Sequence, residues 1–205
     1  MTTVDATLQT PTAVTIGAAI RSRRSTKRLL DTPVDRSVIE RLLEAATWAP
    51  NHHLTEPWRF WVISGAARTR FGEAMAAGDL NTHRDATPEQ RETMRASAVG
   101  KAHRAPVIVA VAAVMAESNR NPDLEEITAT AAAIQNLLLQ AEAEGLGAIW
   151  RTGRSAYEPE MATFFGLGER DRILGFIYIG HPDPDAPIRT SQRRPIDSVT
   201  IWLAG

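Results

Sequence analysis

The chain alternates between stretches in which apolar residues recur every three or four positions and shorter stretches that are apolar almost throughout. The first pattern is typical of a helix that buries one face, as in Val38, Leu42 and Ala46. With Asp35 and Asp123 as N-cap residues, this spacing predicts helices over residues 12–21, 35–48, 65–77, 88–103 and 123–144.

Short runs rich in β-branched and aromatic residues predict strands over residues 58–63, 106–114, 146–150 and 172–180. The run 106–114 is continuously apolar, which is typical of a strand covered on both faces. A further apolar run, Val199–Leu203, ends the chain after a polar segment and has no strand beside it in the sequence. We therefore expect it to dock on a sheet edge, either of its own chain or of a partner.

Helices and strands interleave without a strict strand–helix–strand rhythm, so the sequence predicts the α+β class rather than a doubly wound sheet. Two polar connections are notable. One is the proline-bounded loop 50–57, and the other is the stretch 78–87, which we interpret as part of a mobile flap. We find no internal repeat and no clear domain boundary, so we expect a flexible leader over residues 1–11 and a single domain over 12–205.

Composition narrows the classes of partner. With 205 residues and a net charge of −1, the chain gives no electrostatic reason to expect nucleic acid or a membrane as a partner. The longest apolar run, 105–116, is too short to cross a bilayer as a helix, and the first residues lack the pattern of a secretory signal. The absence of cysteine excludes thiol catalysis and thiolate metal sites, and it suits a reducing compartment, so we expect a cytoplasmic protein.

The densest chemical feature is the basic block 21–28, which holds five cationic residues and three hydroxyl residues within eight positions. Apolar residues flank the block on both sides, so it is anchored rather than loose. Guanidinium forks and hydroxyl donors on a fixed scaffold are suited to binding a phosphate monoester. The alternative is a solvated helix end, where cations favour the negative end of the helix dipole.

Two further clusters carry polar chemistry: residues 49–60, which include two histidines between prolines, and residues 145–153. Each could also be structural, the first as a surface loop and the second as a strand that ends in a turn. The glycines of 145–147 follow a helix and precede a strand, which is the reverse of a dinucleotide-binding turn. The five histidines show no metal-ligand spacing, and neither a nucleophile elbow nor a P-loop is present.

In their order and spacing, these clusters resemble the FMN-dependent nitroreductases, and in particular the compact YdjA-like branch of that family. Members typically have a first helix that runs into Arg-Arg-Ser, here Arg23-Arg24-Ser25, then Ala-Pro at 49–50 and Pro-Trp-[Arg/His]-Phe at 57–60. Later they carry Gly-Leu-Gly, here at 145–147, and Gly-Phe-x-x-x-Gly-x-Pro, here at 175–182. The resemblance extends from about Thr12 to Leu203.

The resemblance implies a central, mostly antiparallel sheet flanked by helices, with the C-terminal strand exchanged in a homodimer. It implies FMN as the cofactor and NAD(P)H as the co-substrate. The implied reaction is a ping-pong hydride transfer through flavin N5 to a small electron-poor acceptor, such as a nitroaromatic, a quinone or an activated alkene. The flavin carries the chemistry, so no catalytic side chain is expected.

The resemblance also implies a role for individual residues. Arg23, Arg24 and Ser25 would hold the phosphate and ribityl chain, and Lys27 would lie near the pyrimidine edge. The other residues implied in the site are Pro50, Asn51 and His52 from the other subunit, Trp150, Arg151 and Thr152 along the ring, Gly153 in the adjacent turn, and Arg194 or Arg193 at the phosphate.

The chain departs from the family pattern in its histidine loop, 52–58, and in a short connection between the middle helices, and both departures bear on which acceptor is preferred. A basic residue near flavin N1 and O2 would favour the anionic reduced flavin, and Lys27 and Arg151 are the candidates. Two alternatives remain. The same scaffold could fragment flavin or remove halogens, or the protein could be a flavin-binding module without turnover.

Overall fold

The computed structural model describes residues 15–115, 121–187 and 190–203, so the leader predicted over 1–11 lies outside the described part. Its centre is a four-stranded sheet in the order β1-β2-β4-β3, in which every neighbouring pair is antiparallel. The strands are β1 (Trp58–Ser64), β2 (Val107–Ala113), β3 (Gly147–Arg151) and β4 (Arg172–Gly180). The expected α+β class with an antiparallel sheet is confirmed.

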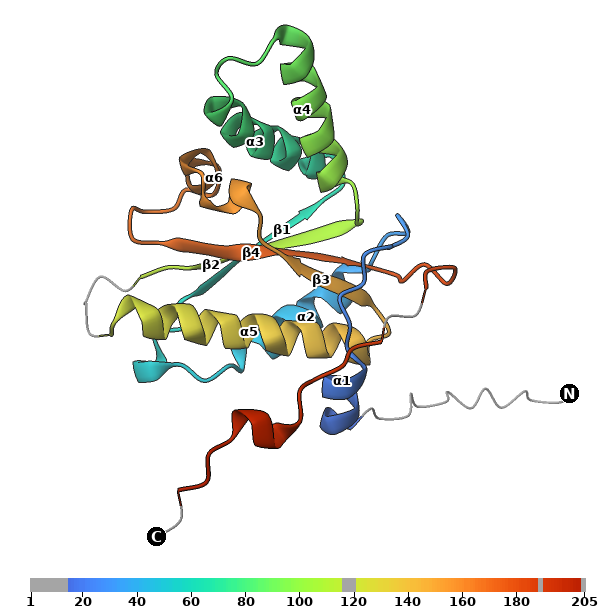
Figure 1. Ribbon diagram of the computed structural model, residues 1–205, viewed down its shortest axis with the longest axis vertical. Helices are drawn as coiled ribbons and strands as arrows, with labels where there is room; N and C mark the ends of the chain where they lie inside the picture. The colour runs from blue at the N-terminus through green and yellow to red at the C-terminus, as the bar shows by residue number, and fades with distance from the viewer. Residues whose placement is uncertain (1–14, 116–120, 188–189, 204–205) are drawn as a thin grey trace, which may run out of the picture.

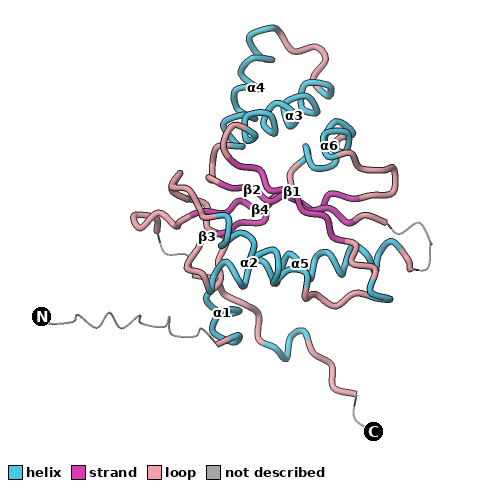
Figure 2. Tube along the Cα trace, turned by 180° about the vertical axis from the view of Figure 1, so that it is seen from behind, coloured by secondary structure: helices cyan, strands magenta, loops and turns pink. Residues whose placement is uncertain are grey.

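Helices cover both faces of the sheet, so the molecule has three layers (Figures 1 and 2). One face carries α2 (Arg36–Thr47) and α5 (Asp123–Ala143), with α1 (Ile16–Ser22) packed against α5. The other face carries α3 (Ala67–Thr82), α4 (Pro88–Ala102) and α6 (Pro159–Phe165). Three short 3-10 helices complete the described elements: η1 (His52–Leu54), η2 (Arg154–Tyr157) and η3 (Ile196–Val199).

Each face of the sheet has its own hydrophobic core. Val109 of β2 packs with Leu137 of α5 in the first core, whereas Ile108 packs with Phe71 of α3 in the second. Because successive side chains of a strand point to opposite faces, β2 contributes to both cores and is buried at every position. This confirms the prediction of a strand that is covered on both sides.

The predicted helix 65–77 was too short. The structure continues α3 to Thr82, so half of the predicted stretch 78–87 is helix, and the connection to α4 is only residues 83–87. Gly78 looked like a helix end, but it is a packing residue: a Cβ there would lie 2.9 Å from the Cβ of Glu158. The glycine allows α3 to approach the chain between η2 and α6, so the excursion is a helical hairpin (Figure 1).

Helix starts differ slightly from the prediction. The first helix begins at Ile16, where the side chain of Thr15 accepts a hydrogen bond from the Ala18 amide, and the predicted start at residues 12–14 is outside the described residues. Pro122, not Asp123, is the N-cap of α5. The Asp123 carboxylate instead lies 2.6 Å from Arg170, so the assignment of Asp123 as a cap was wrong.

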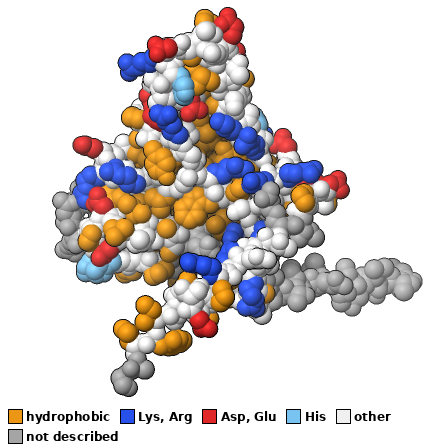
Figure 3. All heavy atoms as spheres, in the orientation of Figure 1, with side chains coloured by type: hydrophobic (Ala, Val, Ile, Leu, Met, Phe, Trp, Pro, Cys, Tyr) orange, Lys and Arg blue, Asp and Glu red, His pale blue; other side chains and the backbone are white. Residues whose placement is uncertain are grey.

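The end of the chain does not extend its own sheet. The predicted strand 199–203 is replaced by η3 and an extended segment that pairs with no described strand. Its side chains are strongly exposed, with Ile201 at 86%, Trp202 at 84% and Leu203 at 96%, and apolar groups gather on this tail in Figure 3. Docking on the chain's own sheet is therefore excluded for residues 190–203.

Across the described ranges, no helix combines the length and the apolar character that crossing a membrane would require.

Candidate functional site

The basic block leaves α1 and runs along the outer edge of β3. Arg23 is the C-cap of α1, so the block is not merely the end of a helix. Ser25 forms a parallel bridge with Ala148, and the amide of Thr26 donates to the Ala148 carbonyl at 3.0 Å. Further along, Leu29 pairs with Pro182 beyond the end of β4. The backbone of the block is thus fixed to the sheet.

Gly147 makes this close approach possible. A Cβ at Gly147 would lie 2.6 Å from Leu29 Cδ2 and 2.8 Å from Thr26 Cγ2, well inside van der Waals contact. Any larger residue would push the basic block away from β3. The Gly-Leu-Gly motif therefore serves the packing of the site rather than a dinucleotide turn.

The cations of the block differ in their partners. Arg28 forms an ion pair with Asp183 at 2.5 Å, and the Arg24 guanidinium donates to carbonyls at the end of α1, including that of Arg21 at 2.5 Å. The side chains of Arg23 and Lys27 make no hydrogen bond or ion pair with any residue in the described part of the chain. Lys27 lines a groove of about 320 Å³, together with Arg24, Ser25, Thr26, Arg28, Pro182, Asp183, Pro184, Ala186 and Pro187.

Trp150, Arg151, Thr152 and Gly153 lie at the end of β3, beyond the residues Gly147 and Ala148 that the block contacts. Trp150 Nε1 donates to the Leu174 carbonyl at 2.9 Å, which fixes the indole against β4. Trp150 and Thr152 line a cavity of about 910 Å³ between β3, η2 and α6.

Arg151 lies on the opposite face of the sheet from Trp150. Its guanidinium carbon is 5.6 Å from the centre of the Tyr178 ring, a cation–π distance. Burial raises the pKa of the Tyr178 hydroxyl, and the charges of Arg151 and Arg104 partly oppose this effect. The two arginines therefore create a positive field at the end of β3.

Three features of these residues fit a bound flavin with its phosphate. Arg23 and Lys27 are cations without a partner in the described chain, which an anionic ligand would supply. Arg151 Nε is a buried donor without an acceptor among the described residues. Gly153 has a φ of +105° with no heavy atom within 4 Å of an added Cβ, so a planar ring can approach its backbone.

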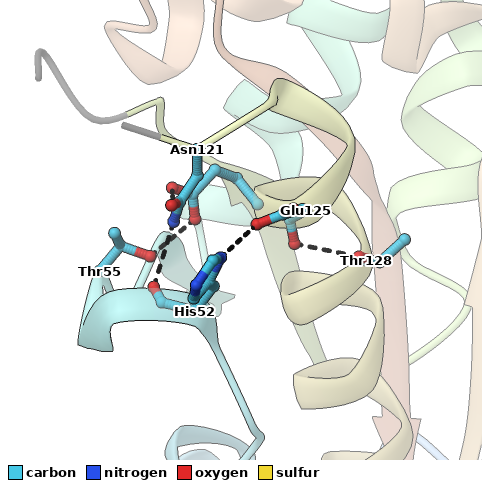
Figure 4. A network of polar contacts seen from close by, with 6 residues as sticks. His52, Thr55, Asn121, Glu125 and Thr128 are labelled. Carbon is cyan, nitrogen blue, oxygen red and sulfur yellow. Dashed lines mark hydrogen bonds and ion pairs between the residues drawn. The ribbon is translucent and has the colours of Figure 1, made fainter. Parts of the chain in front are cut away.

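The proline-bounded loop 50–57, the proline loop, lies at the N-terminal end of α5, where the carboxylates of Glu125 and Glu126 hold it (Figure 4). His52 Nδ1 is 2.7 Å from Glu125 Oε2. Glu126 is only 3% exposed and accepts hydrogen bonds from Thr55 Oγ1 at 2.7 Å and from Asn121 Nδ2 at 3.1 Å. The first turn of α5 thus sets the position of the whole loop.

The backbone of this loop is strained. His53, Leu54 and Glu56 have φ values of 55°, 54° and 45°, in the left-handed region that non-glycine residues seldom adopt. Such conformations cost on the order of 1–3 kcal/mol each and persist only where the surroundings impose them. Asn51 contributes by accepting the Glu56 amide at 2.9 Å on its side-chain oxygen.

The structure connects two of the three sequence clusters through one strand and leaves the third apart. The basic block contacts the start of β3 at Gly147 and Ala148, and Trp150–Gly153 follow further along the same stretch of chain. Pro50, Asn51 and His52 instead lie at the start of α5. A helix of 21 residues is about 31 Å long at 1.5 Å per residue, so the loop and the block are separated by the length of α5.

Arg193 and Arg194, near the end of the chain, make no hydrogen bond or ion pair with the other candidate site residues in the described part of the chain. Arg193 contacts Ser191 and the Gln192 carbonyl, and Arg194 has no hydrogen bond or ion pair with any described residue. Sequence reasoning missed four supporting residues: Thr55, Asn121, Glu125 and Glu126. Two adjacent glutamates at the start of a mostly apolar helix were the available signal, because one of them must face the protein interior.

Comparison with known proteins decides the family. The model of the nitroreductase family matches residues 20–181. The chain belongs to the nitroreductase family. The expectation of an oxidoreductase of the nitroreductase type is thereby confirmed at the level of the family.

Individual relatives and solved structures support the same family assignment. YfhC of Bacillus subtilis is 36% identical over 86% of this chain and 88% of its own, and YdjA of Escherichia coli K12 is 31% identical over 88% and 96%. Both are provisionally named NAD(P)H nitroreductases. A nitroreductase-like protein from Bacillus cereus has a TM-score of 0.80 at 29% identity, covering 95% of this chain and 98% of its own. A protein from Desulfovibrio desulfuricans, provisionally described as a nitroreductase in complex with FMN, has a TM-score of 0.67 at 28% identity, covering 91% and 95%.

Proposed function

We propose that the protein is an FMN-dependent NAD(P)H oxidoreductase that reduces small electron-poor acceptors such as nitroaromatics, quinones or activated alkenes. The observation that carries this proposal is the fixed basic block beside β3, where Arg23 and Lys27 lack partners in the described chain. The FMN complex of the Desulfovibrio neighbour and the names of the curated relatives support the choice of cofactor and co-substrate.

In this proposal Arg23, Arg24 and Ser25 bind the phosphate and ribityl chain, and Lys27 lies at the pyrimidine edge of the ring. The other ring contacts are Trp150, Arg151, Thr152 and Gly153, and Arg194 lies at the phosphate. When bound, FMN supplies hydride acceptance and donation. The cations at this site favour the negative charge of the reduced ring.

Pro50, Asn51 and His52 join the site from a second copy of the chain. FMN is much shorter than α5, so one ligand cannot contact the basic block and the loop of the same chain, about 31 Å apart by the rise of the helix. Two antiparallel copies of α5 would place the loop of one chain beside the block of the other. The proposed assembly is therefore a homodimer with two shared sites, each chain forming one domain over residues 12–205 in the cytoplasm.

The C-terminal tail offers a second contact between the copies. β1 and β3 are the edge strands of the sheet, and the basic block bridges β3 at Ala148, whereas no described segment pairs with the outer edge of β1. A groove of about 460 Å³ follows this edge between β1 and α2, and it includes Val62, which is 47% exposed. We propose that Ile201, Trp202 and Leu203 of the partner dock here.

The test is anaerobic mixing of the purified yellow protein with NADH or NADPH in a stopped-flow spectrophotometer. Reduction should bleach the flavin absorbance, and an electron-poor acceptor should restore it. A protein that takes up no FMN when it is supplied in excess contradicts the cofactor assignment. A protein that binds FMN but is bleached by neither nicotinamide contradicts the reductase activity and favours a binding module.

A further inference from the structure

His52 is held in place on three sides, which is unusual for a residue in a surface loop. Its Nδ1 lies 2.7 Å from Glu125 Oε2. Its ring stacks on that of His53, with 4.0 Å between the ring centres and 15° between the planes. Its carbonyl accepts a hydrogen bond from Asn121 Nδ2 at 3.1 Å. The imidazole therefore has a single defined orientation.

The contact with Glu125 also determines which ring nitrogen is available for chemistry. An ionised carboxylate can only accept hydrogen bonds, so Nδ1 carries a hydrogen and donates it to Glu125. Nε2 is then the nitrogen that can gain or lose a proton. This is the arrangement by which an acidic residue orients a catalytic histidine and stabilises its charged form.

Stability alone does not account for this arrangement. The side chains of His52 and Glu125 are 58% and 43% exposed, and an exposed ion pair contributes little to stability. The buried Glu126 already anchors the loop through Thr55 and Asn121. The contact of Glu125 with the His52 ring therefore adds little to the fold, which favours a functional reason for its geometry.

We propose that His52, oriented by Glu125, donates the proton that the electron acceptor needs when it is reduced at the flavin site of the partner chain. This inference rests on the proposed function. The acceptor takes a hydride from the reduced flavin and a proton from His52 Nε2. The electron pair of the broken N–H bond stays on Nε2, Nδ1 keeps its hydrogen bond to Glu125, and solvent returns a proton to Nε2. Glu125 is a positioning residue in this step.

The first test examines the ring itself and does not depend on turnover. Nitrogen-15 NMR of the purified protein reports which nitrogen of neutral His52 carries the hydrogen. The wild type should have the hydrogen on Nδ1. In Glu125→Gln the ring should shift towards the Nε2–H form that unconstrained histidine prefers. A wild-type ring with its hydrogen on Nε2, or a variant with an unchanged spectrum, overturns the proposal.

The second test compares two acceptors in the reoxidation of the reduced holoenzyme. Menadione, a quinone, takes up protons when it is reduced, whereas ferricyanide takes one electron and no proton. In His52→Gln, reoxidation by menadione should slow by about 100-fold, within the range of general acid catalysis, while reoxidation by ferricyanide stays unchanged.

His53→Asn is the matched control, because it alters the neighbouring ring and leaves the contact between His52 and Glu125 intact. Asparagine also tolerates the left-handed backbone at this position. The control should retain the menadione rate. If His52→Gln loses FMN, Glu125→Gln takes its place and should slow menadione selectively. No slowing, or equal slowing with both acceptors, overturns the proposal, whereas a wild type that binds no flavin contradicts the proposed function instead.

Discussion

The two ends of α5 are organised in opposite ways. At the N-terminal end, Glu125 and Glu126 bind His52, Thr55 and Asn121, so this loop is held by side chains of its own chain (Figure 4). At the C-terminal end, the chain turns into β3, where the basic block is held by backbone contacts to Ala148.

The two ends differ in whether their charged side chains have partners within the chain. The N-terminal end is rigid and its acidic side chains have partners within the chain. The C-terminal end is equally fixed in backbone, but Arg23 and Lys27 have no partner in the described residues. In the proposed function, the loop at one end covers the flavin and the block at the other end binds its phosphate. A site of this kind would combine the two ends from two chains, because α5 separates them within one chain.

The largest effect is expected where the backbone contact itself is broken. Gly147→Val places side-chain atoms where Leu29 and Thr26 now pack, and such overpacking costs about 1–3 kcal/mol. Because the basic block is displaced, FMN affinity should fall together with the melting temperature. Gly100→Ala is the control, since no heavy atom lies within 4 Å of the added Cβ. Unchanged FMN binding in Gly147→Val would contradict the link between this contact and the anion site.

Removing an unpartnered cation should affect binding but not folding. Arg23→Ala should weaken FMN binding by about 10- to 100-fold, since a hydrogen bond to a charged group contributes about 1.5–3 kcal/mol. The apoprotein should melt at the wild-type temperature because Arg23 has no partner there. Arg36→Ala, which removes an exposed arginine from α2, should change FMN affinity little. Titration calorimetry and thermal melting separate the two effects, and a destabilised apoprotein with normal affinity would assign Arg23 a structural role.

At the other end of α5, the expected effect is local. Glu126→Gln removes the negative charge and one of the two accepting oxygens, which weakens the hydrogen bonds from Thr55 and Asn121 at a cost of about 1 kcal/mol. Hydrogen exchange should quicken in the loop 51–56, while the basic block and β3 remain protected. The exposed Glu44→Gln serves as a control without such a contact. Faster exchange over the whole sheet would mean that the loop is not an independent unit.

The smallest effect concerns the ion pair between α2 and the end of α5. The hydrogen bond from Arg41, the largest of the causes, holds the pKa of the Glu144 carboxyl below its usual value. A depressed pKa stabilises the fold above the unfolded carboxyl's pKa, and this stabilisation is lost as pH falls through the folded value. Arg41→Ala should therefore lower the melting temperature slightly at neutral pH, and the difference should disappear in acid. A difference that grows on acidification would contradict the assignment.

Sequence patterning predicted most of the sheet because its strands are buried on both faces or flanked by clear turns. The predicted limits of β4 agree with the structure, and β2 was recognised by its continuous apolar run. The length of α3 was missed because Gly78 serves a contact with Glu158, which no local pattern reveals. The short elements η2 and α6 were not predicted at all.

The parts of the candidate site that consist of contiguous residues were predictable from the sequence. The basic block and the end of β3 were found because charge and glycine motifs mark them. The dependence of the proline loop on Glu125 and Glu126 was not predictable, since these residues lie more than 70 positions away. The apolar pattern of the tail 199–203 predicted a strand, but the described tail pairs with no strand of its own sheet.

The central claim is that one FMN is held by the basic block of one chain and the proline loop of another, and mixed dimers test it most directly. One chain carries Arg23→Ala and Lys27→Ala, and the other carries Asn51→Gly and His52→Gly. If the sites are shared, the mixed dimer has one site with both defects and one intact site, so it should bind one FMN per dimer, while neither variant alone binds any. A mixed dimer that binds no FMN would place each site within a single chain and contradict the account.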